Sequence, residues 1–249
     1  MRIAIAGLGL IGGSIARGLT AAGHHVVGLD DPAVVRRAKR ARAIAAAATS
    51  LEDAAGECDV VFLAAPPRAN LRLLRSLAAR GHRGIVTDVG SVKQPICAEA
   101  MRLGVPGFTG GHPMAGSEGS GFAASEAGLF QGRTWALTPG RHRRTPRALL
   151  ALIRELGARP MVTTPAAHDR AVAFLSHVPQ IVAWALADAA LGDPVARRLL
   201  PLAGPAYRDM TRIAGSPPAL WAQILGQNAA EVRHALAALR RALSRRSPR

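Results

Sequence analysis

The chain contains few cysteines, few lysines and few aromatic residues, and these shortages narrow what it can be. Its two cysteines, Cys58 and Cys97, form no C-x-x-C pair, so we expect neither a disulfide framework nor a metal site. No apolar stretch reaches the ~18 residues that a membrane span needs. The apolar run at the start leads into a glycine loop without a cleavage site, unlike a signal peptide. We therefore expect a cytoplasmic protein with no membrane partner.

Acidic residues are also scarce, because Asp and Glu total 16 against 32 Lys and Arg, for a formal net charge of +16. Only Lys39 and Lys93 are lysines, so almost all of the positive charge is arginine. Such a charge can indicate nucleic-acid binding. The arginines, however, recur as short groups such as Arg36-Arg37, and aromatic residues are only 4% of the chain. We therefore expect a positive surface and no nucleic-acid partner.

The first half of the chain alternates short apolar runs with helical segments. Apolar residues make up 49% of the 249 residues, which is enough to bury a core. Strands are expected at 2–7, 25–30, 58–66, 84–90, 107–113 and 134–139, with a last one within 158–165. Helices are expected at 11–23, 31–42 and 92–103. This alternation predicts an α/β fold with a largely parallel sheet covered on both faces.

The second half changes character and reads as helical from about residue 166 to the end. One helix face is apolar, because residues recur at three-, four- and seven-residue spacings at Leu225, Val232, Leu236, Leu239 and Leu243. We therefore predict two domains, an α/β domain at 1–165 and an all-α domain at 166–249.

A glycine-rich turn follows the first expected strand. It reads G-L-G-L-I-G, with Gly7, Gly9 and Gly12 separated by Leu8, Leu10 and Ile11. The first glycine permits the tight turn, the second lets the backbone approach a pyrophosphate, and the third lets the helix pack on the strand. The amino end of the following helix offers N–H groups and a positive dipole to the anion. The turn predicts a Rossmann-type dinucleotide site.

An acidic residue stands where such a site needs one. Asp30 closes the second strand, 18 residues after Gly12. Its carboxylate can accept hydrogen bonds from the ribose hydroxyls of NAD and would repel the 2′-phosphate of NADP. Arg36 and Arg37 could reach such a phosphate, but a solvated helix face also explains them. We predict NAD as the cofactor, with NADP as the weaker alternative.

Three further motifs carry a resemblance to a known family. They are "TDVGSVK" at 87–93, "GGHPMAGSEGSGFAAS" at 110–125 and "YRDMTRIAGSPPALW" at 207–221. With the opening "GLGLIGGS", they resemble the prephenate/arogenate dehydrogenase family of tyrosine biosynthesis. The resemblance implies a Rossmann-type NAD-binding domain followed by an all-α dimerisation domain, and a homodimer formed through the helical domain. It also implies NAD-dependent oxidative decarboxylation of prephenate to 4-hydroxyphenylpyruvate, of arogenate to tyrosine, or of both.

The resemblance also implies catalytic residues. His112 matches the family's catalytic histidine, which accepts the proton of the substrate hydroxyl, a role that suits a neutral imidazole at neutral pH. Ser91 matches a serine that hydrogen-bonds this histidine beside the nicotinamide. Ser91 could also cap the helix expected from Val92. Lys93 closes the same motif, and we assign it no chemistry.

Substrate contacts are implied at several positions of the later motifs. Arg212 matches an arginine that binds the ring carboxylate, for which a guanidinium can form two parallel bonds. Glu118 matches an acid that pairs with this arginine in some relatives, although it could be an ordinary solvated carboxylate. Asp209 and Trp221 match recurrent family positions. In the family this tryptophan lies near the active site of the partner subunit, although Trp221 could instead be an aromatic residue in a dimer core.

The stretch "SHVPQ" departs from the family pattern. His177 stands where the family has its first histidine, but Gln180 replaces the second, which contacts the substrate side chain. Both could face one ligand from the same helix face, with a kink at Pro179. A glutamine amide can serve either the ammonium of arogenate or the keto group of prephenate. The preference between the two substrates therefore stays open.

Three alternatives remain at the level of sequence. A hydroxyacid dehydrogenase of the 6-phosphogluconate-dehydrogenase type would commonly use a lysine in its helical half, and this half contains none. A relative acting on 4-amino-4-deoxyprephenate would retain His112. A non-enzymatic nucleic-acid-binding module is favoured by the net charge alone. We expect no fused chorismate mutase before the first strand and no regulatory domain after the helical half.

Overall fold

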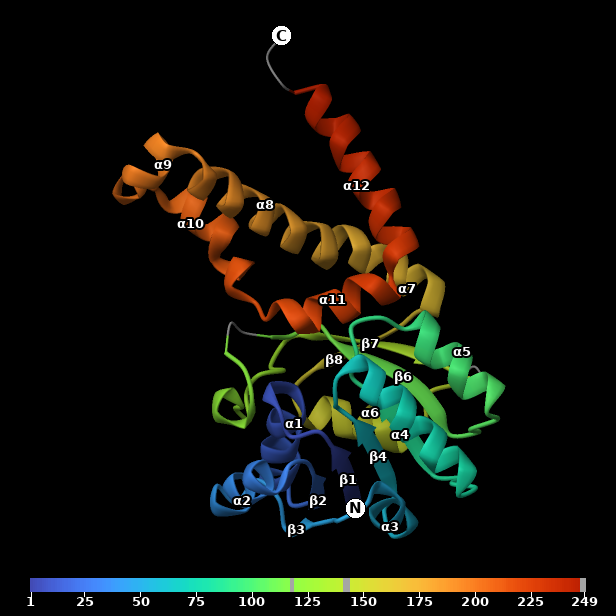
Figure 1. The fold of residues 1–249 in the computed structure, drawn as a ribbon. Helices are drawn as coiled ribbons and strands as arrows, with labels where there is room; N and C mark the ends of the chain where they lie inside the picture. The colour runs from blue at the N-terminus through green and yellow to red at the C-terminus, as the bar shows by residue number, and fades with distance from the viewer. Residues whose placement is uncertain (117–118, 141–143, 247–249) are drawn as a thin grey trace. The chain divides into compact units, whose positions relative to one another are not determined.

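The structure, a computed structural model, describes residues 1–116, 119–140 and 144–246 (Figure 1). The chain forms two compact units, Met1–His168 and Asp169–Arg249. The first unit contains an eight-stranded sheet and the second is helical. This arrangement confirms the predicted fold class, an α/β part followed by an all-α part.

The sheet of the first unit has the strand order β3-β2-β1-β4-β5-β6-β7-β8. The strands are β1 (Arg2–Ala6), β2 (His25–Leu29), β3 (Ala46–Ala47), β4 (Val60–Leu63), β5 (Ile85–Asp88), β6 (Phe108–Pro113), β7 (Thr134–Pro139) and β8 (Arg159–Val162). Neighbouring strands pair in parallel, except that β6 and β7 are antiparallel. The order from β3 to β6 is that of dinucleotide-binding sheets, whose ligands bind where the order reverses, beside β1.

Helices cover both faces of this sheet (Figure 1). They are α1 (Leu10–Ala21), α2 (Pro32–Arg40), α3 (Leu51–Gly56), α4 (Pro67–Ala79), α5 (Gln94–Arg102) and α6 (Arg147–Glu155), with a short 3-10 turn, η1 (Phe122–Ala124). Along β1, Ile3 and Ile5 join the core beneath α1, α2 and α6. Ala4 and Ala6 join the core beneath α3, α4 and α5. Alternate residues thus bury opposite faces, which explains why the strands are apolar throughout.

The second unit is formed by successive helices. The segments are α7 (Pro165–Val172), which crosses the division, the π-helical turn η2 (Ala173–His177), α8 (Val178–Gly192), α9 (Pro194–Arg198), η3 (Leu200–Leu202), α10 (Pro205–Thr211), η4 (Arg212–Gly215), α11 (Pro218–Gln227) and α12 (Ala229–Ser244). Its buried core is small and centres on Ala173, Val178, Val232 and Ala235. The apolar face predicted for the last helix therefore packs inward only in part.

One helical segment of the described chain is longer and more apolar than expected from the sequence. The 28 residues Pro165–Gly192 form a helical run whose length and composition would suffice to cross a membrane, and 33% of its most apolar window is buried. The expectation that no stretch of this length is apolar enough was therefore wrong for this segment. Leu175, on this segment, is 76% exposed.

Candidate active site

The glycine turn joins β1 to α1 and is shaped by close contacts. Gly7 has a φ of +98°, and a Cβ there would lie 2.5 Å from the carbonyl carbon of Ala64 in the neighbouring β4 connection. A Cβ on Gly12 would lie 1.9 Å from the Gly7 carbonyl oxygen. A Cβ on Gly9 would meet nothing within 4 Å, and no side chain caps the amino end of α1 at this residue. The first turn of α1 is therefore accessible to an anion at Gly9. Leu10 and Ile11 begin this helix.

Asp30 lies beside this turn, where β2 ends. Its Oδ2 accepts a hydrogen bond from the backbone N–H of Leu8 at 2.6 Å, and its Oδ1 accepts from the N–H of Asp31 at 2.6 Å. These bonds hold the carboxylate against the glycine loop. A carboxylate oxygen can accept more than one hydrogen bond, so Asp30 keeps acceptor capacity for a ribose hydroxyl.

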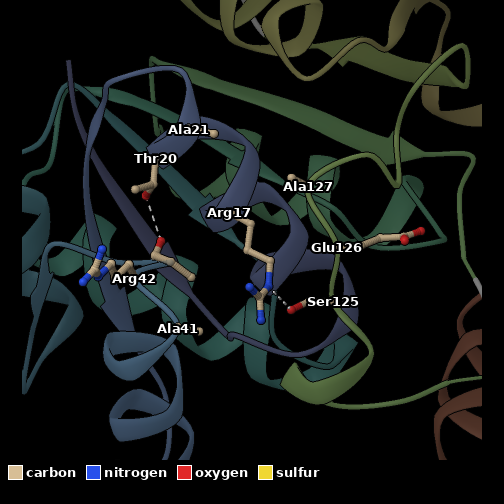
Figure 2. Close-up of a pocket in the computed structure, with 9 residues that line it drawn as sticks. Arg17, Thr20, Ala21, Ala41, Arg42, Ser125, Glu126 and Ala127 are labelled. Atoms are coloured by element: carbon tan, nitrogen blue, oxygen red, sulfur yellow. Dashed lines mark hydrogen bonds between the residues drawn. The ribbon is translucent and has the colours of Figure 1, made fainter.

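A hollow of about 490 Å³ lies further along α1 and contains none of the predicted site residues (Figure 2). Arg17 lines it, donating through Nε to Ser125 Oγ at 2.9 Å and lying over the Phe122 ring. The backbone N–H of Glu126 donates to Ser14 Oγ at 3.0 Å. The end of the 110–125 motif therefore fastens its loop to α1.

The catalytic candidate of the first unit lies near the end of β6. The His112 side chain is buried, with 8% exposure, and its Nδ1 lies 2.9 Å from Nε2 of His168. The preceding Gly111 is needed for close packing, since a Cβ there would lie 2.5 Å from the backbone oxygen of Asp88. The strand can thus carry His112 directly past the carboxyl end of β5.

A buried ion pair holds the backbone of Gly111, the residue just before His112. The Lys93 ammonium pairs with Asp88 Oδ2, and both side chains are almost fully buried. Lys93 Nζ also donates to the carbonyl of Gly111 at 2.7 Å, while Asp88 Oδ1 accepts from the N–H of Gly111 at 3.1 Å. Asp88 Oδ2 further accepts from the N–H of Gly90 at 2.8 Å. We call Asp88, Lys93 and the Gly111 peptide the Gly111 clamp.

Neither this clamp nor His168 was predicted from the sequence. Lys93 was assigned no chemistry, and no role was predicted for Asp88 or His168. A usable signal was present, because Lys93 is one of only two lysines in an arginine-rich chain and follows Asp88 by five residues. Nothing in the sequence pattern pointed to His168, which lies 56 residues from its partner.

Ser91 occupies the turn between β5 and α5. The helix begins at Gln94 rather than at Val92, its N-cap position is Lys93, and no side chain caps it. The alternative interpretation of Ser91 as a helix cap was therefore wrong. Among the residues that the structure describes, no hydrogen bond joins Ser91 to His112. A part for Ser91 beside the nicotinamide stays a prediction. In the described part of the chain, no group of His, Cys, Asp and Glu could hold a metal ion.

In the second unit, His177 closes the π turn and is fully buried. Its Nδ1 lies 3.2 Å from Nδ2 of Asn228, which also donates to the backbone oxygen of Asp169 at 2.8 Å. The Trp221 ring lies edge-on to the His177 ring, with 6.0 Å between their centroids. His177 and Trp221 are thus brought together within this unit, as neighbours in one aromatic cluster.

Gln180 and Trp184 of α8 hold the turn that carries Arg212. Gln180 Nε2 donates to the backbone oxygen of Ile213 at 2.8 Å, and Trp184 Nε1 donates to that of Ala214 at 2.9 Å. Gln180 is 1% exposed, whereas Arg212 is exposed on its unit. The Gln180 amide nitrogen therefore donates its hydrogen bond to the backbone next to Arg212. The remaining substrate candidate, Glu118, lies outside the described residues.

Comparison with known families accounts for nearly the whole chain. The family description "Prephenate dehydrogenase, nucleotide-binding domain" matches residues 15–162, and "Prephenate dehydrogenase, dimerization domain" matches residues 164–247. The chain belongs to the prephenate dehydrogenase family. This confirms the resemblance on which the sequence analysis relied, and a nucleotide-binding function of the first part.

Named relatives and solved structures agree with this membership. The chain is 36% identical over 241 residues to prephenate dehydrogenase of Bacillus subtilis, a match covering 91% of the chain and 64% of the relative. A match to prephenate dehydrogenase of Lactococcus lactis is 34% identical and covers 91% of the chain and 65% of the relative. The chain thus spans about two thirds or slightly less of these relatives.

Two solved structures of the family superpose closely on the chain. Arogenate dehydrogenase of Synechocystis has a TM-score of 0.82 at 32% identity, over 98% of this chain and 90% of that one. Prephenate dehydrogenase of Aquifex aeolicus, in complex with hydroxyphenyl propionate and NAD+, has a TM-score of 0.87 at 30% identity, over 98% and 88%.

Proposed function

We propose that the chain is an NAD-dependent dehydrogenase that oxidatively decarboxylates prephenate, arogenate or both. The observation that carries this proposal is His112, a buried imidazole at the end of β6 with one ring nitrogen hydrogen-bonded to a second histidine. Relatives that act on prephenate, on arogenate and on cyclohexadienyl substrates share the family.

The glycine turn fits a dinucleotide. Gly9 leaves open space before the uncapped amino end of α1, which suits a pyrophosphate. Asp30 would receive the adenosine ribose, and its negative charge favours NAD over NADP. When bound, NAD supplies the hydride acceptor for the oxidation. A solved relative is named as an NAD+ complex, which supports this cofactor.

His112 would accept the proton of the substrate's ring hydroxyl. Nδ1 of the ring lies within hydrogen-bond distance of His168 Nε2, and we assign the proton transfer to the other ring nitrogen, Nε2. Burial of the ring and the Gly111 clamp fix its position before substrate arrives, which is how orientation contributes to rate. Loss of CO₂ leaves an aromatic ring, and this aromatisation supplies the driving force of the reaction.

Arg212 would bind the ring carboxylate of the substrate by two parallel hydrogen bonds. The bonds from Gln180 and Trp184 to the carbonyls that follow it support this use, because they fix its turn. In this arrangement Gln180 acts on the substrate through the backbone beside Arg212. Gln180 would then make no contact with the substrate side chain, which is the group that distinguishes arogenate from prephenate. We therefore propose that the enzyme accepts both substrates.

The second unit would pair with a second copy of the chain. Its core is small, and apolar side chains such as Leu175 and Leu202 are 76% and 77% exposed. A homodimer formed through the helices would bury them, in line with the family description of this region as a dimerization domain. Sedimentation at micromolar concentration tests this, and a monomeric mass would contradict it.

The decisive experiment measures kcat/KM for prephenate and for arogenate with NAD, by the appearance of NADH. We expect turnover of both substrates, with NADP a poorer acceptor than NAD. No NADH formation with either substrate, from a folded protein that binds NAD, would refute the proposed function. Strict use of one substrate would refute the proposed tolerance and leave the reaction class intact.

A further inference from the structure

The contact between His112 and His168 has the geometry of a hydrogen bond between two imidazole rings. Their rings meet edge to face, at an interplanar angle of 68°, and Nδ1 of His112 lies 2.9 Å from Nε2 of His168. Both side chains are buried, at 8% and 4% exposure. Both belong to the first compact unit, so the contact does not depend on how the two units are arranged.

The position of His168 is itself held by its helix. The Thr164 hydroxyl accepts from the backbone N–H of Ala167 at 3.2 Å, which caps the first turn of α7. The N–H of His168 donates to the Thr164 carbonyl at 2.9 Å. The imidazole of His168 therefore projects from a capped helical turn rather than from an unsupported loop.

Two neutral imidazoles can share only one proton in such a contact. If His168 donated, His112 would carry its own proton on Nε2 and could not act as a base there. If His112 donates from Nδ1, its Nε2 keeps a lone pair. A catalytic base that is oriented by a second group through its other nitrogen is a recurrent arrangement in enzymes.

We infer that His168 is the positioning residue of the base. Its Nε2 accepts the Nδ1 proton of His112, which selects the tautomer with a basic Nε2 and holds the ring in place. The inference rests on the proposed function for the part played by His112. When His112 takes the substrate proton on Nε2, its Nδ1–H becomes a cationic donor to His168, and the hydrogen bond strengthens. The proton stays on Nε2 of His112, and His168 remains neutral.

Substitutions at His168 separate this role from simple packing. His168→Leu keeps bulk but removes the acceptor, and we expect kcat to fall by about 10²-fold with little change in NAD affinity. His168→Gln places an amide oxygen near the former Nε2 position, and we expect it to restore kcat to within about tenfold of the native value. His25→Leu, at an exposed histidine of the same unit, is the matched control and should leave kcat unchanged.

Nuclear magnetic resonance tests the tautomer without turnover. The protein is labelled with ¹⁵N-histidine and measured at a pH high enough for both rings to be neutral. Under these conditions His112 should show a protonated Nδ1 and an unprotonated Nε2. Its signals are assigned by their loss in His112→Asn. In His168→Leu we expect a mixture of tautomers, and in His168→Gln the native one.

A His112 ring protonated on Nε2 in the native protein would overturn the inference. So would His168→Leu with native kcat, or a His168→Gln variant as impaired as His168→Leu when both are folded. If His168→Leu does not fold, the tautomer of His112 in the native protein and the kcat of His168→Gln still test the inference. A protein with the expected tautomer but no turnover of either substrate would refute the proposed function and retain the histidine pairing.

Discussion

Replacing Lys93 with Met tests the Gly111 clamp most directly. The side chains of Lys93 and Asp88 are 0% and 1% exposed, so the substitution leaves a carboxylate buried without its cation. Breaking a buried pair in this way destabilises proteins by about 3–5 kcal/mol. Asp88 would keep hydrogen bonds from the N–H groups of Gly90 and Gly111, so we expect a loss near the lower end, about 3 kcal/mol.

This loss is large enough to measure. For a chain of this size, a change of 1 kcal/mol shifts Tm by about 2–4 °C, so Tm should fall by about 6–12 °C. Below the new Tm the Gly111 carbonyl lacks its Lys93 donor, so the peptide next to His112 can shift. We expect kcat to fall by about ten- to a hundredfold, because small misplacements of a catalytic group have effects of this size. Thermal and urea unfolding by circular dichroism, together with NADH formation, measure both effects.

The chain supplies its own control. Lys39 is the only other lysine, it is exposed on α2, and Lys39→Met should change neither Tm nor kcat. The double variant Asp88→Asn with Lys93→Met removes both charges, and we expect it to be less destabilised than the sum of the single variants by about 1–3 kcal/mol. Additive single effects, or a Tm of Lys93→Met within 2 °C of native (about 1 kcal/mol or less), would refute the reasoning.

Three further substitutions test other parts of the site. His112→Asn should lower kcat by about 10²–10⁴ while NAD affinity, measured by calorimetry, stays native; near-native turnover would remove His112 from catalysis. Asp30→Ser should lower the kcat/KM ratio of NAD over NADP by about ten- to a hundredfold, because a charged hydrogen bond is worth about 1.5–3 kcal/mol; an unchanged ratio would show that Asp30 does not read the ribose. Gln180→Leu should raise the KM of both substrates about tenfold with a smaller change in kcat, because the Arg212 turn loses a buried hydrogen bond; a change confined to one substrate would mean that Gln180 contacts the substrate itself.

Much of the first unit could be predicted from local sequence. Apolar runs such as "RIAIAG" and "VVFL" became β1 and β4 because a strand covered on both faces is apolar at every position. The two-residue strand β3 was missed, since Ala46–Ala47 is too short to show any period. The start of α5 was placed two residues early, at Val92, whereas the chain turns once more to bring Lys93 to Asp88.

The sequence alone determined the α/β class and the family, and it predicted the glycine turn with Asp30 and His112 as the catalytic base, because each depends on residues close together in the chain or on motifs of fixed spacing. Only the tertiary structure decided which groups act on these residues. Lys93 meets the Gly111 carbonyl across 18 positions, Gln180 meets Ile213 across 33, and His168 meets His112 across 56. Such contacts leave no periodic pattern, because they arise where strands and helices of separate segments pack together. The chain has only two lysines, and one of them, Lys93, holds the backbone carbonyl beside the proposed catalytic base.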